Sequence, residues 1–192
     1  MSMCLYMHNV MLADRLCINE NDDCVRLGDM QKLHVSACQR FAFSYCGSKL
    51  LRAQLWEMET YLAGILTMSV ATKKPYSLHP EDDARDHAHS LFKNQHVMLM
   101  TRDAVYDRDP KYSGVFVRVE NTDIIVNGTY GNAVYTALMI TEYNHQQMPL
   151  TAEKMCEIAA STIEYISGRR SPTINHVCQS NLLPFVAPAE EA

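Results

Sequence analysis

Ser2 is the residue of this sequence best suited to nucleophilic chemistry, provided that Met1 is removed. The freed α-amine would have an ordinary pKa of about 7.7 to 8.0, and it could accept the proton of the serine's own hydroxyl near neutral pH. Lys32 opens a later predicted strand, and its positive charge would lower the pKa of this amine further by like-charge repulsion. These residue types predict attack on a carbonyl carbon by an N-terminal serine. The simpler alternative is an ordinary second residue that permits removal of the methionine.

A predicted hairpin brings an acidic side chain to this serine. The segment 4–12 is apolar and is interrupted by a His-Asn dipeptide that tolerates a tight turn. Antiparallel pairing around that turn joins residues whose numbers sum to about 17, so Asp14 and Arg15 should lie beside the start of the first strand and Ser2. Asp14 is therefore a candidate to hold the amine, and an ion pair with Arg15 at the strand end is the structural alternative.

Two other groups of residues could carry chemistry. Cys4 could act as an N-terminal nucleophile only after removal of residues 1–3, and a small buried thiol in the hairpin is the simpler interpretation. The segment 81–89 gathers acids and imidazoles, with Asp83 and His87 four residues apart on one helical face, as metal ligands are on helices. The helix dipole also favours acids at a helix start, and no complementary ligand motif is found elsewhere in the sequence, so we predict no metal site and no cofactor.

The apolar patterns predict the strands that would position these residues. Phe41, Phe43 and Tyr45 alternate with small residues, which indicates a strand with one aromatic face in the segment that begins at Lys32. Three β-prone runs with short polar connections indicate an antiparallel meander: 97–101, 115–119 and 124–126. A short strand at 173–178 follows near the end of the chain.

Pairs of helices are predicted between these strands, which favours an α+β fold over a parallel βαβ sheet. The first begins after a cap at Ser48, and the second runs from 80 to about 92. The third begins near residue 133, and the fourth has Thr151 as its N-cap and Gly168 at its end. The first helix should bury one face, made by Leu51, Leu55, Met58, Leu62 and Ile65. The fourth helix should bury the face made by Met155, Ile158, Ala159, Thr162, Ile163 and Ile166.

The composition indicates one domain. The chain has 192 residues, of which 47% are hydrophobic and 20% charged, and this length is sufficient for one sizeable core and short for two. We predict a single domain at 1–180 and a C-terminal tail at 181–192. Seventeen basic and 22 acidic residues give a net charge of −5, which disfavours a nucleic-acid partner.

The sequence also predicts a cytoplasmic protein without a membrane partner. Its apolar stretches fall short of the roughly 18 residues of a membrane-spanning helix, and the N-terminus lacks the charged, apolar and small-residue order of a signal peptide. Seven cysteines form no C-x-x-C pair and are odd in number, which indicates reduced thiols.

Short motifs along roughly residues 2–178 resemble, in the same order, those of proteasome-type (HslV-like) N-terminal nucleophile hydrolases. Residues 1–15 resemble the Met-Thr-Thr opening, the hairpin and the Ala-Asp-Arg motif of that family. The other similar segments are Gln31-Lys32-Leu33 at the third strand, 43–48 before the first helix, 127–129 before a later helix, and 150–155 with 158–160 in the last long helix. Each motif is short, and their common order carries the resemblance.

The resemblance implies a four-layer αββα sandwich within the α+β class, in which two sheets meet face to face. It implies that Ser2 is the nucleophile and that Asp14 and Lys32 hold and tune its amine. The backbone amide of Ser44 would donate a hydrogen bond to the oxyanion. The positions that would correspond to the family's serine and glycine near the amine are Asn127, Gly128 and Thr129.

Two functions follow from the resemblance. The first is a peptidase that cleaves peptide bonds in a peptide or protein substrate through Ser2, in a homo-oligomeric ring or shell, with an ATPase as a further possible partner. The second is a catalytically silent subunit that keeps the same fold for ring assembly. The second is open because serine replaces the family's threonine, Ser44 replaces the oxyanion-turn glycine, and Asn127-Gly128-Thr129 replaces a Gly-Ser-Gly segment.

Overall fold

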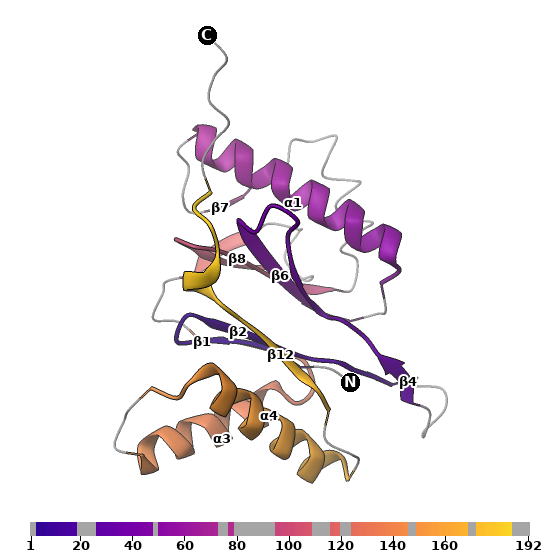
Figure 1. The fold of residues 1–192 in the computed structure, drawn as a ribbon, viewed down its shortest axis with the longest axis vertical. Coiled ribbons are helices and arrows are strands. Elements are labelled where there is room, and N and C mark those ends of the chain that lie inside the picture. Colours follow the sequence, from indigo (N-terminus) through magenta and orange to yellow (C-terminus); the bar gives the residue numbers. More distant parts are fainter. Residues whose placement is uncertain are drawn as a thin grey trace.

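The computed structural model describes residues 3–18, 26–47, 50–72, 77–78, 95–108, 116–119, 124–145, 149–168 and 172–185. Within these ranges the chain has a mixed α+β fold with two main antiparallel sheets and three α-helices (Figure 1). A two-stranded ribbon is formed in addition by β3 (Leu16–Ile18) and β4 (Arg26–Asp29). The predicted α+β class is therefore confirmed.

The first sheet is built around the N-terminal hairpin and has the order β11-β1-β2-β12. Its strands are β1 (Cys4–Met7), β2 (Val10–Asp14), β11 (Ile125–Asn127) and β12 (Ile174–Cys178). His8 and Asn9 form the turn, with φ values of 51° and 62°, which is the left-handed geometry of a two-residue hairpin turn. Cys4 pairs with Ala13 and Leu5 with Leu12, so the predicted register is confirmed.

The second sheet has six strands in the order β5-β6-β8-β9-β10-β7. Its strands are β5 (Leu33–Val35), β6 (Phe41–Cys46), β7 (Ser77–Leu78), β8 (His96–Thr101), β9 (Val105–Arg108) and β10 (Phe116–Val119). The predicted strand at 97–101 belongs to this sheet, and so do the described residues 116–119 of the predicted strand 115–119. The predicted meander is wrong, because β9 lies between these two strands and the third run is placed in the other sheet, where β11 pairs with β1. The reason is burial, because Ile125 packs between the sheets while Val126 packs beneath the helices.

Helix α1 (Arg52–Thr72) covers one face of the six-stranded sheet. Phe41, Phe43 and Tyr45 of β6 all pack in the cluster beneath it, which confirms the predicted aromatic face. From α1 the cluster includes Met58, Leu62, Ile65 and Leu66. Leu51 was predicted to belong to the buried face of this helix, and this prediction is wrong: Leu51 is 64% exposed, because the helix begins one residue after it. The predicted cap at Ser48 and the predicted helix at 80–92 lie outside the described residues.

Helices α3 (Gly131–Asn144) and α4 (Ala152–Ser167) cover one face of the four-stranded sheet (Figure 1). Thr151 caps α4 by accepting a hydrogen bond from the amide of Lys154, and Gly168 ends it with a φ of 61°, so both predicted caps are confirmed. Met155, Ala159 and Ile163 are buried as predicted, whereas Ile166 is half exposed because it lies in the last turn, at the rim of the sheet.

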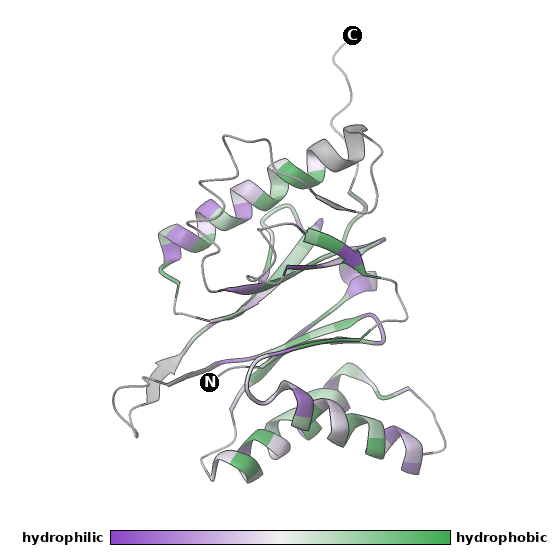
Figure 2. Ribbon diagram, turned by 180° about the vertical axis from the view of Figure 1, so that it is seen from behind, coloured by the Kyte–Doolittle hydropathy of each residue, from purple (hydrophilic) through white to green (hydrophobic). Residues whose placement is uncertain are grey.

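The two sheets face each other through a third cluster of buried side chains. Alternate residues of the central strands point into it, including Cys4, Tyr6, Met11 and Ala13 from one sheet and Ala42, Cys46, Met98 and Met100 from the other. In Figure 2 the strands of the N-terminal hairpin are green, since their residues are apolar on both faces. Leu182 also belongs to this cluster, so the second residue of the segment predicted as a tail at 181–192 contacts the core.

In the described ranges, no helix combines the length and the apolar composition that a membrane span requires.

Candidate active site

A buried ion pair joins the two sheets at one end of the N-terminal hairpin. The Nζ atom of Lys32, just before β5, lies 2.5 Å from Oδ1 of Asp14, the last residue of β2. The side chains are 3% and 0% exposed. Removing one partner of such a pair leaves an uncompensated charge in the interior, so the pair is costly to break.

This pair lies beside the start of the first strand. The amide of Asp14 donates to the carbonyl oxygen of Met3 over 3.1 Å, and the carbonyl oxygen of Lys32 accepts from the amide of Tyr45, also over 3.1 Å. Met3 is the first residue that the structure describes, and the predicted nucleophile, Ser2, lies outside the described residues. The structure thus brings Asp14 and Lys32 together directly next to the residue that follows Ser2.

Cys4 lies within the same region and is fully buried. Its Sγ donates to the carbonyl oxygen of Tyr45 over 3.2 Å. Burial raises the pKa of the Cys4 thiol well above its ordinary value, and neighbouring Cys46 and Asp14 raise this pKa further. Because the thiolate is the nucleophilic form, the protonated thiol of Cys4 fits the predicted buried cysteine better than a nucleophile.

Ser44 lies in the middle of β6, opposite Leu33 on one side and Met98 on the other. Its hydroxyl is buried and has no hydrogen-bond partner within the described part of the chain. Since the amide of Tyr45 points toward Lys32 and amides alternate along a strand, the amide of Ser44 points toward β8. The amide predicted to bind the oxyanion is thus directed into the sheet.

Gly47 is a better placed amide donor that sequence reasoning missed. It follows the last residue of β6, is exposed, and has a φ of 144°, a conformation that favours glycine. Residues two apart in a strand direct their amides to the same side, so the amide of Gly47 lies on the same side of β6 as that of Tyr45, which is the side of β5. The signal in the sequence was a glycine immediately after the aromatic strand.

The turn after β11 lies on the other side of the first strand. Asn127 is the partner of Cys4 in the pairing of β11 with β1, and its Nδ2 donates to Oδ1 of Asp107 on β9 over 3.3 Å. Gly128 has a φ of 90°, and its carbonyl oxygen accepts from the amide of Gly131 at the start of α3. Gly128 and Thr129 are exposed. The structure therefore places the predicted segment 127–129 beside the start of β1.

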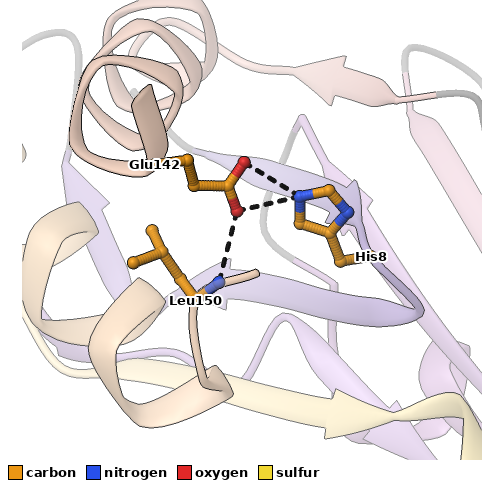
Figure 3. A network of polar contacts seen from close by, with 3 residues as sticks. All are labelled: His8, Glu142 and Leu150. Atoms are coloured by element: carbon orange, nitrogen blue, oxygen red, sulfur yellow. Dashed lines mark hydrogen bonds and ion pairs between the residues drawn. The ribbon is translucent and has the colours of Figure 1, made fainter. Parts of the chain in front are cut away.

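A second polar network lies at the opposite end of the hairpin (Figure 3). His8, in the turn, has its Nε2 2.8 Å from Oε1 and 3.0 Å from Oε2 of Glu142 on α3. The same carboxylate accepts from the amide of Leu150, just before α4, over 3.3 Å. This network connects the turn to both helices and is separate from the Asp14 and Lys32 pair.

No cluster of metal ligands is found in the part of the chain that the structure describes. Within it, no group of three or more His, Cys, Asp and Glu side chains is arranged to hold a metal ion. The acidic segment 81–89, which was weighed as a source of ligands, lies outside the described residues.

The fold is similar to solved structures of known proteins. Eukaryotic HslV from Trypanosoma brucei superposes with a TM-score of 0.56 at 12% sequence identity, over 92% of this chain and 97% of that chain. BPH from Thiobacillus denitrificans superposes with a TM-score of 0.52 at 11% identity, over 92% of this chain and 95% of that one. No protein-family model matches the sequence, and no curated protein matches it. At such low identity the similarity shows a proteasome-like fold and leaves the activity to be argued from the site.

Proposed function

We propose that this chain is a proteasome-like N-terminal nucleophile peptidase in which Ser2 is freed by cleavage of the bond between Met1 and Ser2. The observation that carries the proposal is the buried pair of Asp14 and Lys32, whose acidic member donates its amide to Met3. A hydrophobic core gains little from such a pair, since similar apolar residues would pack there at no cost in desolvation. A buried charged pair beside the first strand is explained if it tunes the pKa of the proposed Ser2 amine.

The alternation of side chains supports the placement of the nucleophile. Cys4 and Tyr6 face the second sheet, whereas Met3 and Leu5 face the helices. Because side chains alternate with a period of two, positions an even number of residues from Cys4 in an extended strand face the second sheet.

In the proposed reaction the α-amine of Ser2 accepts the proton of its own hydroxyl, and the alkoxide attacks the carbonyl carbon of a peptide bond. The ammonium group of Lys32 lowers the pKa of this amine by repulsion, so the amine is neutral and able to act as a base near neutral pH. The proton then passes to the leaving amine, and water releases the acyl group from the serine. Asp14 holds Lys32 in place through the ion pair.

We propose Gly47 as the main donor to the oxyanion, with the turn at Gly128 and Thr129 on the opposite side of the nucleophile. A backbone amide beyond the paired part of a strand can bind developing negative charge without reorganising. Gly47 meets this condition, because it follows the last residue of β6 and the pairing of β6 with β5 ends at Ser44. The amide of Ser44 points toward β8, so Ser44 would not contact the oxyanion and would only help to hold β6 in position.

We also propose the four-layer αββα sandwich and a homo-oligomeric, ring-like assembly in the cytoplasm. The clusters beneath α1, between the sheets and beneath α3 and α4 support this order of layers. Assembly is supported by the outer face of α3, where Met139, Ile140 and Tyr143 are exposed and uncharged. A peptide or protein substrate, and an ATPase that would deliver it, belong to the same proposal.

The proposal is tested by intact-protein mass and by covalent labelling with a peptide epoxyketone, a reagent that reacts with both the amine and the hydroxyl of an N-terminal serine. We expect a mass that corresponds to a chain beginning at Ser2, and labelling that is lost in Ser2→Ala and retained in Ser2→Thr. Ser44→Ala is the matched control and should be labelled like the wild type. Uniform retention of Met1, or equal labelling of the wild type and Ser2→Ala, would reject the peptidase and leave the silent subunit.

A further inference from the structure

Three polar side chains cross between the sheets in one row at the start of the first strand. Asp14 on β2 binds Lys32, Cys4 on β1 donates to the carbonyl oxygen of Tyr45, and Asn127 on β11 donates to Asp107. The three strands are neighbours, and the register places Cys4 directly opposite both Ala13 and Asn127. Elsewhere the space between the sheets is filled largely by apolar side chains.

Each of these bonds joins a strand beside Ser2 to the sheet that carries Lys32 and Gly47. Cys4 lies two residues after Ser2, and Tyr45 lies two residues before Gly47. The hydrogen bond between Cys4 and Tyr45 therefore fixes the distance between the strand of the nucleophile and the turn of the oxyanion donor. The hydrogen bond from Asn127 to Asp107 likewise fixes the distance between the turn at Gly128 and the second sheet.

We propose that Cys4 and Asp107 are positioning residues, which hold the two sheets at the spacing that the Ser2 nucleophile requires. The inference rests on the proposed function and extends it to two residues that do not touch the substrate. A thiol is a weak donor, so its bond to Tyr45 adds little to stability. Position matters more, since a displacement of about 1 Å between reacting groups can cost about a hundredfold in rate.

Gln179 offers a matched control, because it forms a hydrogen bond between the same two sheets but far from the proposed nucleophile. Gln179, 5% exposed and just after β12, donates from Nε2 to the carbonyl oxygen of Thr101 on β8 over 2.9 Å. It also accepts from the hydroxyl of Tyr6, and its amide donates to Asn9 in the hairpin turn. Gln179 thus ties the same two sheets together at the opposite end of the first strand.

The experiment measures the maximal rate of labelling by the peptide epoxyketone and the probe concentration that gives half this rate, for purified full-length variants. For Cys4→Ala and Asp107→Ala we expect the maximal rate to fall about tenfold, with the half-rate concentration within about twofold of wild type. Cys4→Ser and Asp107→Asn, which keep a donor and an acceptor, should retain the rate within about threefold. Gln179→Leu should lower the midpoint of thermal unfolding and leave the labelling rate unchanged.

The possible outcomes separate this inference from the proposed function. Labelling that depends on Ser2 but proceeds at the wild-type rate in both alanine variants would overturn the positioning role alone. An equal loss of rate in Gln179→Leu would overturn it as well, because the effect would then follow general stability. Labelling of the wild type that does not depend on Ser2 would overturn both the function and this inference.

Discussion

The two ends of the β1–β2 hairpin hold their charged side chains in different ways. At the start of the strand, Lys32 and Asp14 are 3% and 0% exposed and join two sheets. At the turn, His8 and Glu142 are 40% and 12% exposed and join the sheet to the helices (Figure 3). An exposed pair contributes little to stability, whereas a buried one is costly to break and is seldom better than apolar packing. The difference matches the proposed function, in which the turn end serves the fold and the Asp14–Lys32 end would serve chemistry.

Lys32→Met should have the largest effect of the changes that test this contrast between the two ends of the hairpin. This change leaves the Asp14 carboxylate buried without its partner and should cost about 3–5 kcal/mol in the free energy of unfolding, measured by urea denaturation. Labelling by the epoxyketone should be lost. The double variant Lys32→Met with Asp14→Leu should recover most of the stability without recovering labelling, and recovery of both would contradict a chemical role.

High pH should lower the free energy of unfolding through Cys4, which lies at the start of β1. Burial raises the pKa of the Cys4 thiol, so above the ordinary thiol pKa of about 8.5 the unfolded chain loses this proton while the folded chain keeps it. The free energy of unfolding should therefore fall as the pH rises, by up to about 1.4 kcal/mol per pH unit from this thiol. Cys4→Ser should show a smaller fall in urea denaturation between about pH 8 and pH 10, and identical slopes would contradict this account.

A methyl group added at Gly131 tests how closely the turn after β11 is packed. An alanine Cβ there would lie 2.6 Å from Cγ1 of Val126, a stiff β-branched side chain, so Gly131→Ala should destabilise by about 1–2 kcal/mol. Gly64→Ala in α1 is the matched control, since nothing lies within 4 Å of its Cβ, and it should stabilise by about 0.5–1 kcal/mol. Thermal unfolding distinguishes the two, and a stabilised Gly131→Ala would contradict the close packing.

The smallest effect is expected at the turn end. Glu142→Gln removes the charge that faces His8 but keeps an oxygen that can accept from the amide of Leu150. It should cost less than about 1 kcal/mol in the free energy of unfolding and leave labelling at the wild-type rate. A large loss of labelling in Glu142→Gln would remove the distinction between the two ends.

Much of the local structure could be predicted from the sequence because its signals are local. The register of the hairpin follows from a turn at His8 and Asn9, and the ends of α4 follow from Thr151 and Gly168. The sheet to which 124–126 belongs could not be predicted, since its partner strand lies more than a hundred residues away. Strand β9 was missed because Asp107 and Arg108 obscure its apolar pattern, and Arg108 is buried nevertheless.

In the candidate site, too, the contacts within the hairpin could be predicted from the sequence, and the contacts between the sheets could not. Asp14 was placed beside Met3 by the hairpin alone, and the structure shows that contact. The contact of Asp14 with Lys32 joins two sheets, and no spacing within one strand predicts it; the family resemblance suggested that the two residues act together. The direction of the Ser44 amide depends on which neighbour each strand bonds, which the alternation of side chains does not reveal.

The pairing of the first strands has a consequence for synthesis of the protein. β1 pairs on its outer side with Ile125–Asn127, and β2 pairs with Ile174–Cys178. The ribosome therefore delivers the hairpin first, and both of its edges wait for partners that emerge much later. Even if methionine is cut from the nascent chain early, the proposed serine amine would be freed before either edge of the hairpin has its partner strand. Under the proposed function, the surroundings of Ser2 would be complete only after β11 and β12 have joined the sheet.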